Sequence, residues 1–173
     1  MTVVYPEGVL ARGKESVIYV PTIANVAAPT VAELTAAGAV NISCYLSGFQ
    51  PQGEQGATED RRLCSEQVFE TPGDVKVSID NLEYVYYPQS APSDPNNKAY
   101  DIMKKDVVGY LVDRRGLNAR TSAIAATQRC DVYPIRLGEQ FRTPVDPGTE
   151  GQKFRIQQKA FVTGPYQYDA IIA

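Results

Sequence analysis

Short segments in which hydrophobic and polar residues alternate recur along the chain, and this period-two pattern predicts β-strands. Such segments lie at residues 16–20, 39–46, 107–116, 129–137 and 152–165. In the second of them, Val40, Ile42, Cys44 and Leu46 fall on one face, which predicts that this face is turned toward a core. Because twelve prolines and thirteen glycines punctuate the chain, we predict a mainly β fold, an antiparallel β-sandwich or barrel with one or two short flanking helices.

The segment KVSIDNLEYVYYPQ, residues 76–89, begins with the same alternation and then loses it. Val77 and Ile79 precede Asp80-Asn81, a pair that is typical of a tight turn. The residues after this pair divide between two faces, with Leu82, Tyr84 and Tyr86 on one and Glu83, Val85 and Tyr87 on the other. Because apolar or aromatic groups occupy both faces, we expect the second face to be covered as well, either by this chain or by another subunit.

Two segments carry the signals of short helices. Residues 28–38 contain Thr30 and Glu33 at the spacing of a capping box. Residues 92–106 contain Asp94 as a candidate N-cap, followed by a proline at the first helical position. We therefore expect both segments to form helices beside the sheet.

The pattern of hydrophobic and polar residues is least regular between residues 47 and 74. Residues 47–57, SGFQPQGEQGA, are rich in Gly and Gln and have little to bury, so we predict a long loop or an extended hairpin arm that is mobile in the free subunit. Residues 58–70, TEDRRLCSEQVFE, can be extended, but neither face is consistently apolar. The sequence TPGD at residues 71–74 is typical of a turn.

The length of 173 residues suffices for one compact domain. We predict a single domain over 1–173, with an N-terminal arm at 1–15 and a C-terminal arm at 165–173. The segment MTVVYPEGVLARG lacks the pattern of a signal peptide, and no apolar run approaches the ~20 residues of a membrane helix. We therefore expect no contact with membranes.

Histidine is absent from the sequence, which excludes the Ser-His-Asp and Cys-His arrangements and the usual zinc sites. Glycine motifs for phosphates or dinucleotides are absent too, and the adjacent Glu59 and Asp60 would point to opposite faces of a strand. Cys44, Cys64 and Cys130 lack a metal-binding spacing and are expected to be reduced thiols of a cytosolic folding environment. We expect no enzymatic activity, no cofactor and no metal.

Charge is distributed unevenly along the chain. Residues 1–100 hold twelve acids and six bases, whereas residues 101–173 hold eight acids and eleven bases. This asymmetry fits complementary surfaces for self-assembly or two solvated faces. Asp113 before Arg114-Arg115 is compatible with an anion site or with a strand end that enters a polar turn. Because the sequence pI is about 5.0, we expect no tight DNA binding, although DNA could pass such a surface without binding.

Five segments follow one another in a fixed order from residue 60 to residue 169. They are DRRLCSEQVFETPG, IDNLEYVYYPQ, NKAYDIMKKDVVGYLVDRRG, CDVYPIRLGEQFRTP and KFRIQQKAFVTGPYQYD. In their order and spacing, the chain resembles the major tail (tail tube) proteins of long-tailed bacteriophages, particularly those that infect actinobacteria. No single segment is a functional fingerprint, so the resemblance depends on all five together.

This resemblance implies a β-sandwich subunit that self-assembles into stacked hexameric rings. The inner sheets of six subunits would join into a barrel around a lumen through which phage DNA is ejected into the host, without specific binding. Long loops and terminal arms would tie one ring to the next. The implied partners are the subunit itself, the tape measure protein, the tail terminator and the distal tail proteins. The implied location is the virion tail, assembled in the host bacterial cytoplasm.

Three sets of candidate residues follow from these expectations. The candidates for the subunit interface are Tyr84, Tyr86, Tyr87, Arg114 and Arg115. The candidates for an inter-ring loop are Phe49, Gln50, Gln52, Glu54 and Gln55. The candidates for the lumen wall are Glu59, Asp60 and Glu66, because fixed positive charge on that wall would retard sliding DNA. We expect the arginines in inter-subunit salt bridges instead.

Two other functional classes are compatible with the sequence. A β-sandwich binding module, such as an adhesin or a capsid-decoration protein, would act as a monomer or small oligomer. An enzyme that uses carboxylate chemistry would need a paired acid and base, and no motif supplies one. The appearance of the purified protein in the electron microscope, as tubes and rings or as compact particles, distinguishes the first class from a tube subunit.

Overall fold

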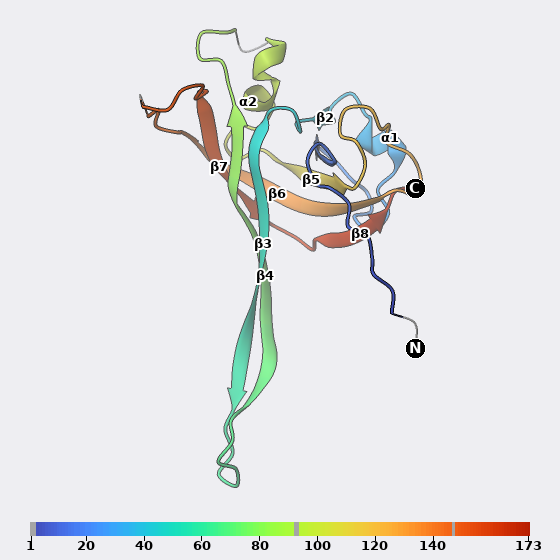
Figure 1. Ribbon diagram of the computed structural model, residues 1–173, viewed down its shortest axis with the longest axis vertical. Helices are drawn as coiled ribbons and strands as arrows, with labels where there is room; N and C mark the ends of the chain where they lie inside the picture. The colour runs from blue at the N-terminus through green and yellow to red at the C-terminus, as the bar shows by residue number, and fades with distance from the viewer. Residues whose placement is uncertain (1–2, 92–93, 147) are drawn as a thin grey trace.

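The computed structural model describes residues 3–91, 94–146 and 148–173, and shows a curled β-sheet from which a long hairpin projects (Figure 1). The elements are β1 (Glu15–Val20), α1 (Val31–Leu34), β2 (Val40–Asn41), β3 (Leu46–Asp60), β4 (Phe69–Val85), the 3-10 turn η1 (Pro95–Asn97), α2 (Lys98–Ile102), β5 (Val108–Arg115), β6 (Arg129–Arg142), β7 (Arg155–Val162) and β8 (Gln167–Ile171). Within this part of the chain, all strand pairs are antiparallel, in the order β2-β1-β5-β6-β7-β4-β3, with β8 beside β6. The predicted mainly antiparallel β fold with short flanking helices is thus confirmed.

The larger of two apolar cores lies on one face of the curled sheet. Side chains from β1, β4, β5, β6 and β7 meet there in one buried cluster. Its fully buried members include Ile79, Leu82, Tyr84, Leu111, Ile135 and Ile156. Ala99 and Met103, in and directly after α2, also belong to this core, so the second helix covers one end of it.

The smaller core lies on the opposite face of β1, β5 and β6. It is formed by Ile18, Leu34, Val112, Val132 and Ile172, among others. Helix α1 reaches this core through Leu34, and its N-terminus has the predicted capping box: the Glu33 N–H donates to Thr30 Oγ1 at 3.2 Å, and the Thr30 N–H donates to Glu33 Oε2 at 2.8 Å. Asp94 caps η1 as expected, although residues 92 and 93 of that predicted helix lie outside the described residues.

The segment that was expected to turn at Asp80-Asn81 is instead one continuous strand, β4. Its pairing with β7 shifts register between Ile79 and Leu82, which marks a β-bulge. The bulge absorbs an extra residue, so Ile79 and Leu82 both point into the larger core although they are three residues apart. Long-range pairing therefore overrides the local turn signal.

The TPGD turn predicted at residues 71–74 also lies inside β4, and residues 47–57 lie in β3. Of the two alternatives for 47–57, the structure shows the hairpin arm. Pro72 pairs with Ala57 in this ladder, and the chain reverses at residues 61–68, beyond the end of β3. The turn shifts because two long strands that pair along their whole length outweigh a four-residue turn preference.

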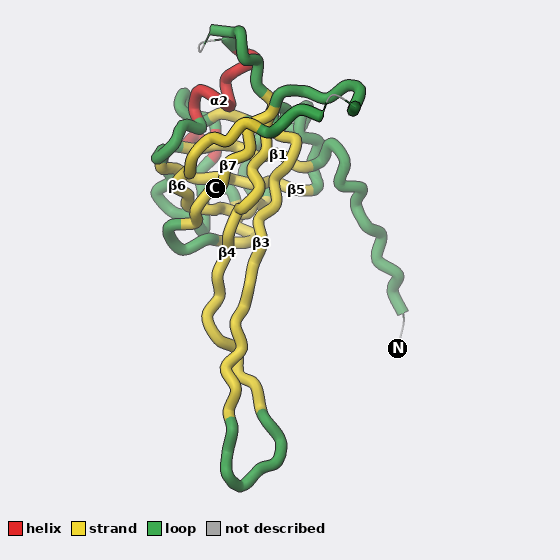
Figure 2. The backbone as a smooth tube through the Cα atoms, turned by 90° about the vertical axis from the view of Figure 1, so that its left-hand side faces the viewer, coloured by secondary structure: helices red, strands yellow, loops and turns green. Residues whose placement is uncertain are grey.

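Two further expectations differ from the structure. Strand β2 ends at Asn41, and Cys44 is exposed, because the Asn41 side chain accepts hydrogen bonds from the Ser43 N–H and hydroxyl and turns the chain there. The C-terminal residues do not form a free arm, because β8 pairs with β6 and Ile172 is buried. Residues 3–13, by contrast, are exposed and extend from the body without regular secondary structure (Figure 2).

The second face of the 82–87 segment is partly covered by the chain itself. Glu83 accepts hydrogen bonds from the Ser47 hydroxyl at 2.9 Å and from Arg155 Nη1 at 3.3 Å. Val85 is half-buried, whereas Tyr87 is 58% exposed. Among the described residues, no helix is long and apolar enough to span a membrane.

Candidate assembly surfaces

The most prominent surface feature is the arm, which we define as residues 54–76 of β3, β4 and their connecting loop. It projects from the body along the long axis of the molecule (Figures 1 and 2). Strand β4 pairs with β7 only between Ile79 and Val85, so within the described chain the two strands of the arm pair with each other alone. No described residue of the arm is buried.

The arm combines apolar side chains with a net negative charge. Its exposed large hydrophobic residues are Leu63, Val68, Phe69 and Val75. Its charged residues are the acids Glu54, Glu59, Asp60, Glu66, Glu70 and Asp74 and the bases Arg61, Arg62 and Lys76. An isolated two-stranded ribbon is only marginally stable in water. Large exposed apolar side chains that lie together mark a contact surface. The composition of the arm therefore makes it a candidate contact surface.

The lumen candidates Glu59, Asp60 and Glu66 lie in this arm. Glu59 pairs with Arg61 at 2.6 Å and Asp60 with Arg62 at 2.9 Å. Both pairs are exposed and contribute little to stability. The position of these residues relative to a lumen stays a prediction.

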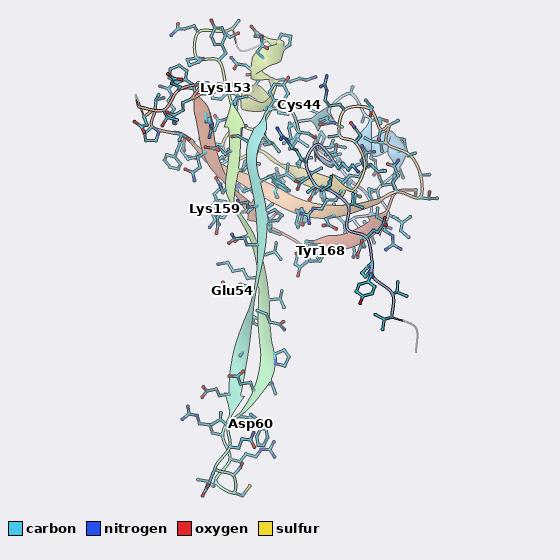
Figure 3. All side chains as sticks on the ribbon, in the orientation of Figure 1. Cys44, Glu54, Asp60, Lys153, Lys159 and Tyr168 are labelled. Atoms are coloured by element: carbon cyan, nitrogen blue, oxygen red, sulfur yellow. The ribbon has the colours of Figure 1, made fainter. Side chains whose placement is uncertain are left out.

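An aromatic group lies at the opposite end of the molecule. The rings of Tyr86 and Tyr100 stack with their centroids 5.6 Å apart, and Phe154 meets Tyr86 edge-on at 6.5 Å. Together with Tyr45, Tyr87 and Lys153, Tyr86 and Phe154 line a pocket of about 480 Å³, the aromatic pocket. Figure 3 shows Lys153 and Cys44 of this pocket at one end of the long axis and Asp60 at the other.

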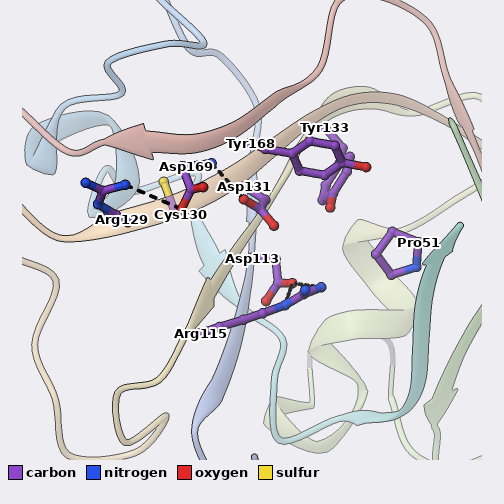
Figure 4. A pocket seen from close by; sticks show the side chains of 9 residues that line it. All are labelled: Pro51, Asp113, Arg115, Arg129, Cys130, Asp131, Tyr133, Tyr168 and Asp169. Carbon is purple, nitrogen blue, oxygen red and sulfur yellow. Dashed lines mark hydrogen bonds and ion pairs between the residues drawn. The ribbon is translucent and has the colours of Figure 1, made fainter. Parts of the chain in front are cut away.

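A second pocket, of about 730 Å³, lies between β3, β5, β6 and β8 (Figure 4). We call it the acidic pocket, because Asp113, Asp131 and Asp169 line it. Asp113 and Asp131 are directly opposite each other in the β5–β6 ladder, so both carboxylates lie on one face. Arg115 donates from Nε and Nη2 to Asp113 Oδ2, each at 2.6 Å.

The carboxyl group of Asp113 is held in an unusual environment. Its side chain has no exposed surface, and Oδ1 is buried without a hydrogen-bond partner. Burial raises the pKa of Asp113 to about 7; Glu15 and Asp131 add to the rise, and Arg115 opposes it. Asp131 accepts one hydrogen bond, from the backbone N–H of Asp169 at 2.9 Å.

Asp113→Asn should change the pH dependence of stability in the free subunit. The pKa of Asp113 rises from its ordinary value of 3.8 to about 7 on folding. The folded state therefore binds this proton more tightly, and the stabilisation that is present below about pH 4 is lost as the pH rises through about 7. Thermal denaturation from pH 4 to 8 should show that the variant gains stability relative to the wild type across this window.

The control for this measurement is Asp106→Asn. Asp106 is an exposed acid with a positive φ of 65°, which Asn tolerates. The Asp106 side chain pairs with Arg136 at 2.9 Å in an exposed ion pair, which contributes little to stability. Equal pH dependence of the two variants would contradict the raised pKa of Asp113.

The five interface candidates divide between the interior and the surface. Tyr84 is fully buried, and its hydroxyl is hydrogen-bonded to the side chains of Gln158 at 3.1 Å and Gln140 at 2.7 Å. Arg114 is also buried, because the chain after β5 wraps around its guanidinium. These two residues are therefore part of the interior and cannot contact a partner in this conformation. Tyr87 and Arg115 are exposed, and Tyr86 is half-buried.

The anion site considered at Asp113-Arg114-Arg115 is not formed. Arg114 and Arg115 point to opposite faces, Arg115 pairs with Asp113, and β5 ends there before Gly116 with a φ of 87°. This corresponds to the alternative of a strand end that enters a polar turn.

The inter-ring candidates lie along β3. Phe49 is half-buried and packs edge-on against Tyr133, with ring centroids 6.5 Å apart. Gln50, Gln52, Glu54 and Gln55 are exposed. Their contact with a second ring stays a prediction.

The candidate residues include neither the apolar side chains of the arm nor the paired aspartates of the acidic pocket. Leu63 and Phe69 lie in residues 58–70, a segment in which neither face is consistently apolar. The pairing of Asp113 with Asp131 depends on the β5–β6 register, and the 13 residues between the two strands carry no local signal for it.

Comparison with known proteins shows one match that spans nearly the whole chain. A model of the family described as phage tail tube protein matches residues 2–173. A search of curated proteins finds no match. Proteins of this family are structural components of the virion tail. The match covers the sheet, the arm and both pockets, and it confirms the resemblance inferred from the five ordered segments. The chain therefore belongs to the phage tail tube protein family.

Proposed function

We propose that this protein assembles into stacked hexameric rings that form the tail tube, the conduit through which phage DNA is ejected into the host. The observation that carries the proposal is the arm. It holds exposed apolar side chains on a ribbon whose strands have only each other as partners within the described chain. Binding to neighbouring subunits would supply the cover that the arm lacks.

Stacking is supported by the position of complementary surfaces at opposite ends of the long axis. The apolar, acidic arm lies at one end, and the aromatic pocket with Lys153 lies at the other (Figure 3). When two subunits bind head to tail through unlike surfaces, one surface of each subunit stays unbound. Each added subunit therefore leaves a free end to which another subunit can bind. This geometry generates an open-ended assembly, as a tube requires.

Ring formation is supported by the open sheet. The strand order ends at β3, which within the described residues pairs on one side only, with β4. An edge strand of this length is a template for pairing with another chain. Neighbours that cover this edge around a closed ring would join their sheets into a barrel.

The acidic composition of the arm is compatible with DNA transport. If Glu59, Asp60 and Glu66 line the lumen, the wall repels phosphates and DNA slides without being retained. A tube whose lumen is lined by arginine would contradict this part of the proposal. The tape measure protein would occupy the lumen before DNA, and terminator and distal tail proteins would bind the two ends.

The proposal is tested by the assembly state of the purified protein. Light scattering and negative-stain microscopy over rising concentration should show hexamers, then tubes with a central hole. Discrete compact particles at every concentration would favour a monomeric or small-oligomer binding module. If the subunits need an initiator, they should extend sheared tails purified from the phage, and failure to add to those ends would contradict the proposal.

A further inference from the structure

We propose that the acidic pocket receives one cationic side chain, a lysine ammonium or an arginine guanidinium, from a second copy of this chain. The inference rests on the proposed tube assembly and names the partner group of a site that this assembly would bury. It is carried by three observations: an acid pair with too little positive charge, a buried acceptor without a donor, and unpaired cations at the far end of the molecule.

The first observation is the charge of the pocket. Asp113 and Asp131 face each other across two paired strands, and Glu15 lies beside Arg115 at 3.7 Å. Arg115 is therefore shared between Asp113 and Glu15, while Asp131 forms no ion pair within the described residues. The other cation of the pocket, Arg129, pairs with Asp169 at 3.8 Å. Like charges directly opposite each other destabilise a sheet, so Asp131 is the carboxylate of this pocket that a further cation would pair with.

The second observation is the unsatisfied acceptor. Asp113 Oδ1 is buried and has no donor, while both bonds from Arg115 reach Oδ2. A buried acceptor without a donor is unfavourable, and burial raises the pKa of this carboxyl to about 7. A second cation beside Asp131 would favour the ionised form of the pair and would leave Arg115 free to reorient toward Oδ1.

The lining of the pocket favours an organic cation. Tyr168 is exposed and meets the buried Tyr133 edge-on, with ring centroids 6.1 Å apart, so the ring of Tyr168 offers aromatic surface in the pocket that Asp131 lines (Figure 4). Ammonium and guanidinium groups bind aromatic faces and donate several hydrogen bonds to carboxylates. Among the described residues, no group of carboxylates and cysteines is suited to hold a metal ion.

The third observation identifies a source of the cation. Tyr168 lies on the side of the body from which the arm leaves, whereas Lys153 lies at the opposite end (Figure 3). Neither Lys153 nor Lys98 of α2 forms an ion pair within the part of the chain that the structure describes. Lys98 and Lys153 are therefore free to pair with the acidic pocket of a neighbouring copy, whose charge is complementary to theirs.

The proposal is tested with Asp131→Asn, which keeps the shape of the side chain and removes its charge. The concentration required for tube formation should rise about tenfold, as for loss of one partner of a buried ion pair. The thermal stability of the free subunit should stay equal or rise, because the repulsion from Asp113 is relieved. A purely structural role for Asp131 predicts instead that both properties decline together.

Asp106→Asn is the matched control and should leave both properties unchanged. Coupling with a carbodiimide should join the Asp131 or Asp169 peptide to a lysine peptide of another copy in tubes and not in free subunits. Unchanged assembly of Asp131→Asn would overturn the proposal. The pocket would instead bind a small cation if Mg²⁺ or arginine amide stabilised the free wild type but not the Asp131→Asn variant, while the variant assembled like the wild type. Wild-type protein that never assembles would contradict the proposed function itself.

Discussion

Subunits in which residues 54–76 are replaced by Asn-Gly should fold normally and fail to form tubes. Gly53 and Val77 are paired in the β3–β4 ladder, so a two-residue turn can connect them. The replacement removes no buried residue, because every described residue of the arm is exposed or half-buried. The free energy of unfolding should therefore change by no more than about 1 kcal/mol. Tube formation should be lost at any accessible concentration, because the shortened subunit lacks the surface proposed to contact the next ring.

Urea denaturation and negative-stain microscopy measure the two effects separately. Isolated hexamers without stacking would show that the arm acts between rings, whereas monomers alone would show that it also closes the ring. The double variant Leu63→Ser with Phe69→Ser keeps the arm and removes two of its exposed apolar side chains. This variant should form tubes only at higher concentration. Tubes of normal length from the shortened subunit would contradict the proposed role of the arm.

The sequence was sufficient where structure depends on neighbours in the chain. The capping box at Thr30 and Glu33 and the cap at Asp94 are local arrangements, and both are present. The first strand was predicted at residues 16–20, and β1 covers these residues, because a β-branched run that ends at a proline has few alternatives. The mainly β class followed from the same local signals.

The sequence was insufficient where a residue's role depends on a distant strand. Asp80-Asn81 forms a bulge because β7 pairs on both sides of it, and residues 71–74 are extended because β3 pairs with them. Tyr84 and Tyr87 differ in burial although both are tyrosines of one aromatic run. The alternation of the segment is visible in the sequence, but neither the end of β4 at Val85 nor the elements that cover each face can be read from it.

The two arginines at the end of β5 show the same limit. Alternation predicts that Arg114 and Arg115 point to opposite faces, as they do. It does not predict that the segment from Ser122 to Gln128 folds over Arg114 and supplies its acceptors. Hence one of the two was assigned to a subunit interface although it is enclosed by its own chain.

Arg114→Ala should destabilise the free subunit by about 3 kcal/mol, the largest effect expected for a single charged residue here. The guanidinium donates to the backbone carbonyls of Ser122 at 2.9 Å and Ala123 at 2.8 Å, and to Gln128 Oε1 at 2.8 Å. Its removal leaves these acceptors without their donor and opens a cavity beneath the loop. For a chain of this length the melting temperature should fall by roughly 10 °C, which thermal and urea denaturation can measure.

Arg120→Ala is the matched control, because Arg120 is exposed in the same loop. Its effect on unfolding should stay within about 0.5 kcal/mol. Arg114→Lys keeps the positive charge and loses the planar fork that reaches three acceptors at once, so it should recover only part of the stability. If Arg114→Ala instead melted like the wild type and impaired only tube formation, Arg114 would be an interface residue after all. That result would show that the 117–128 loop opens on assembly and releases the guanidinium to a neighbouring subunit.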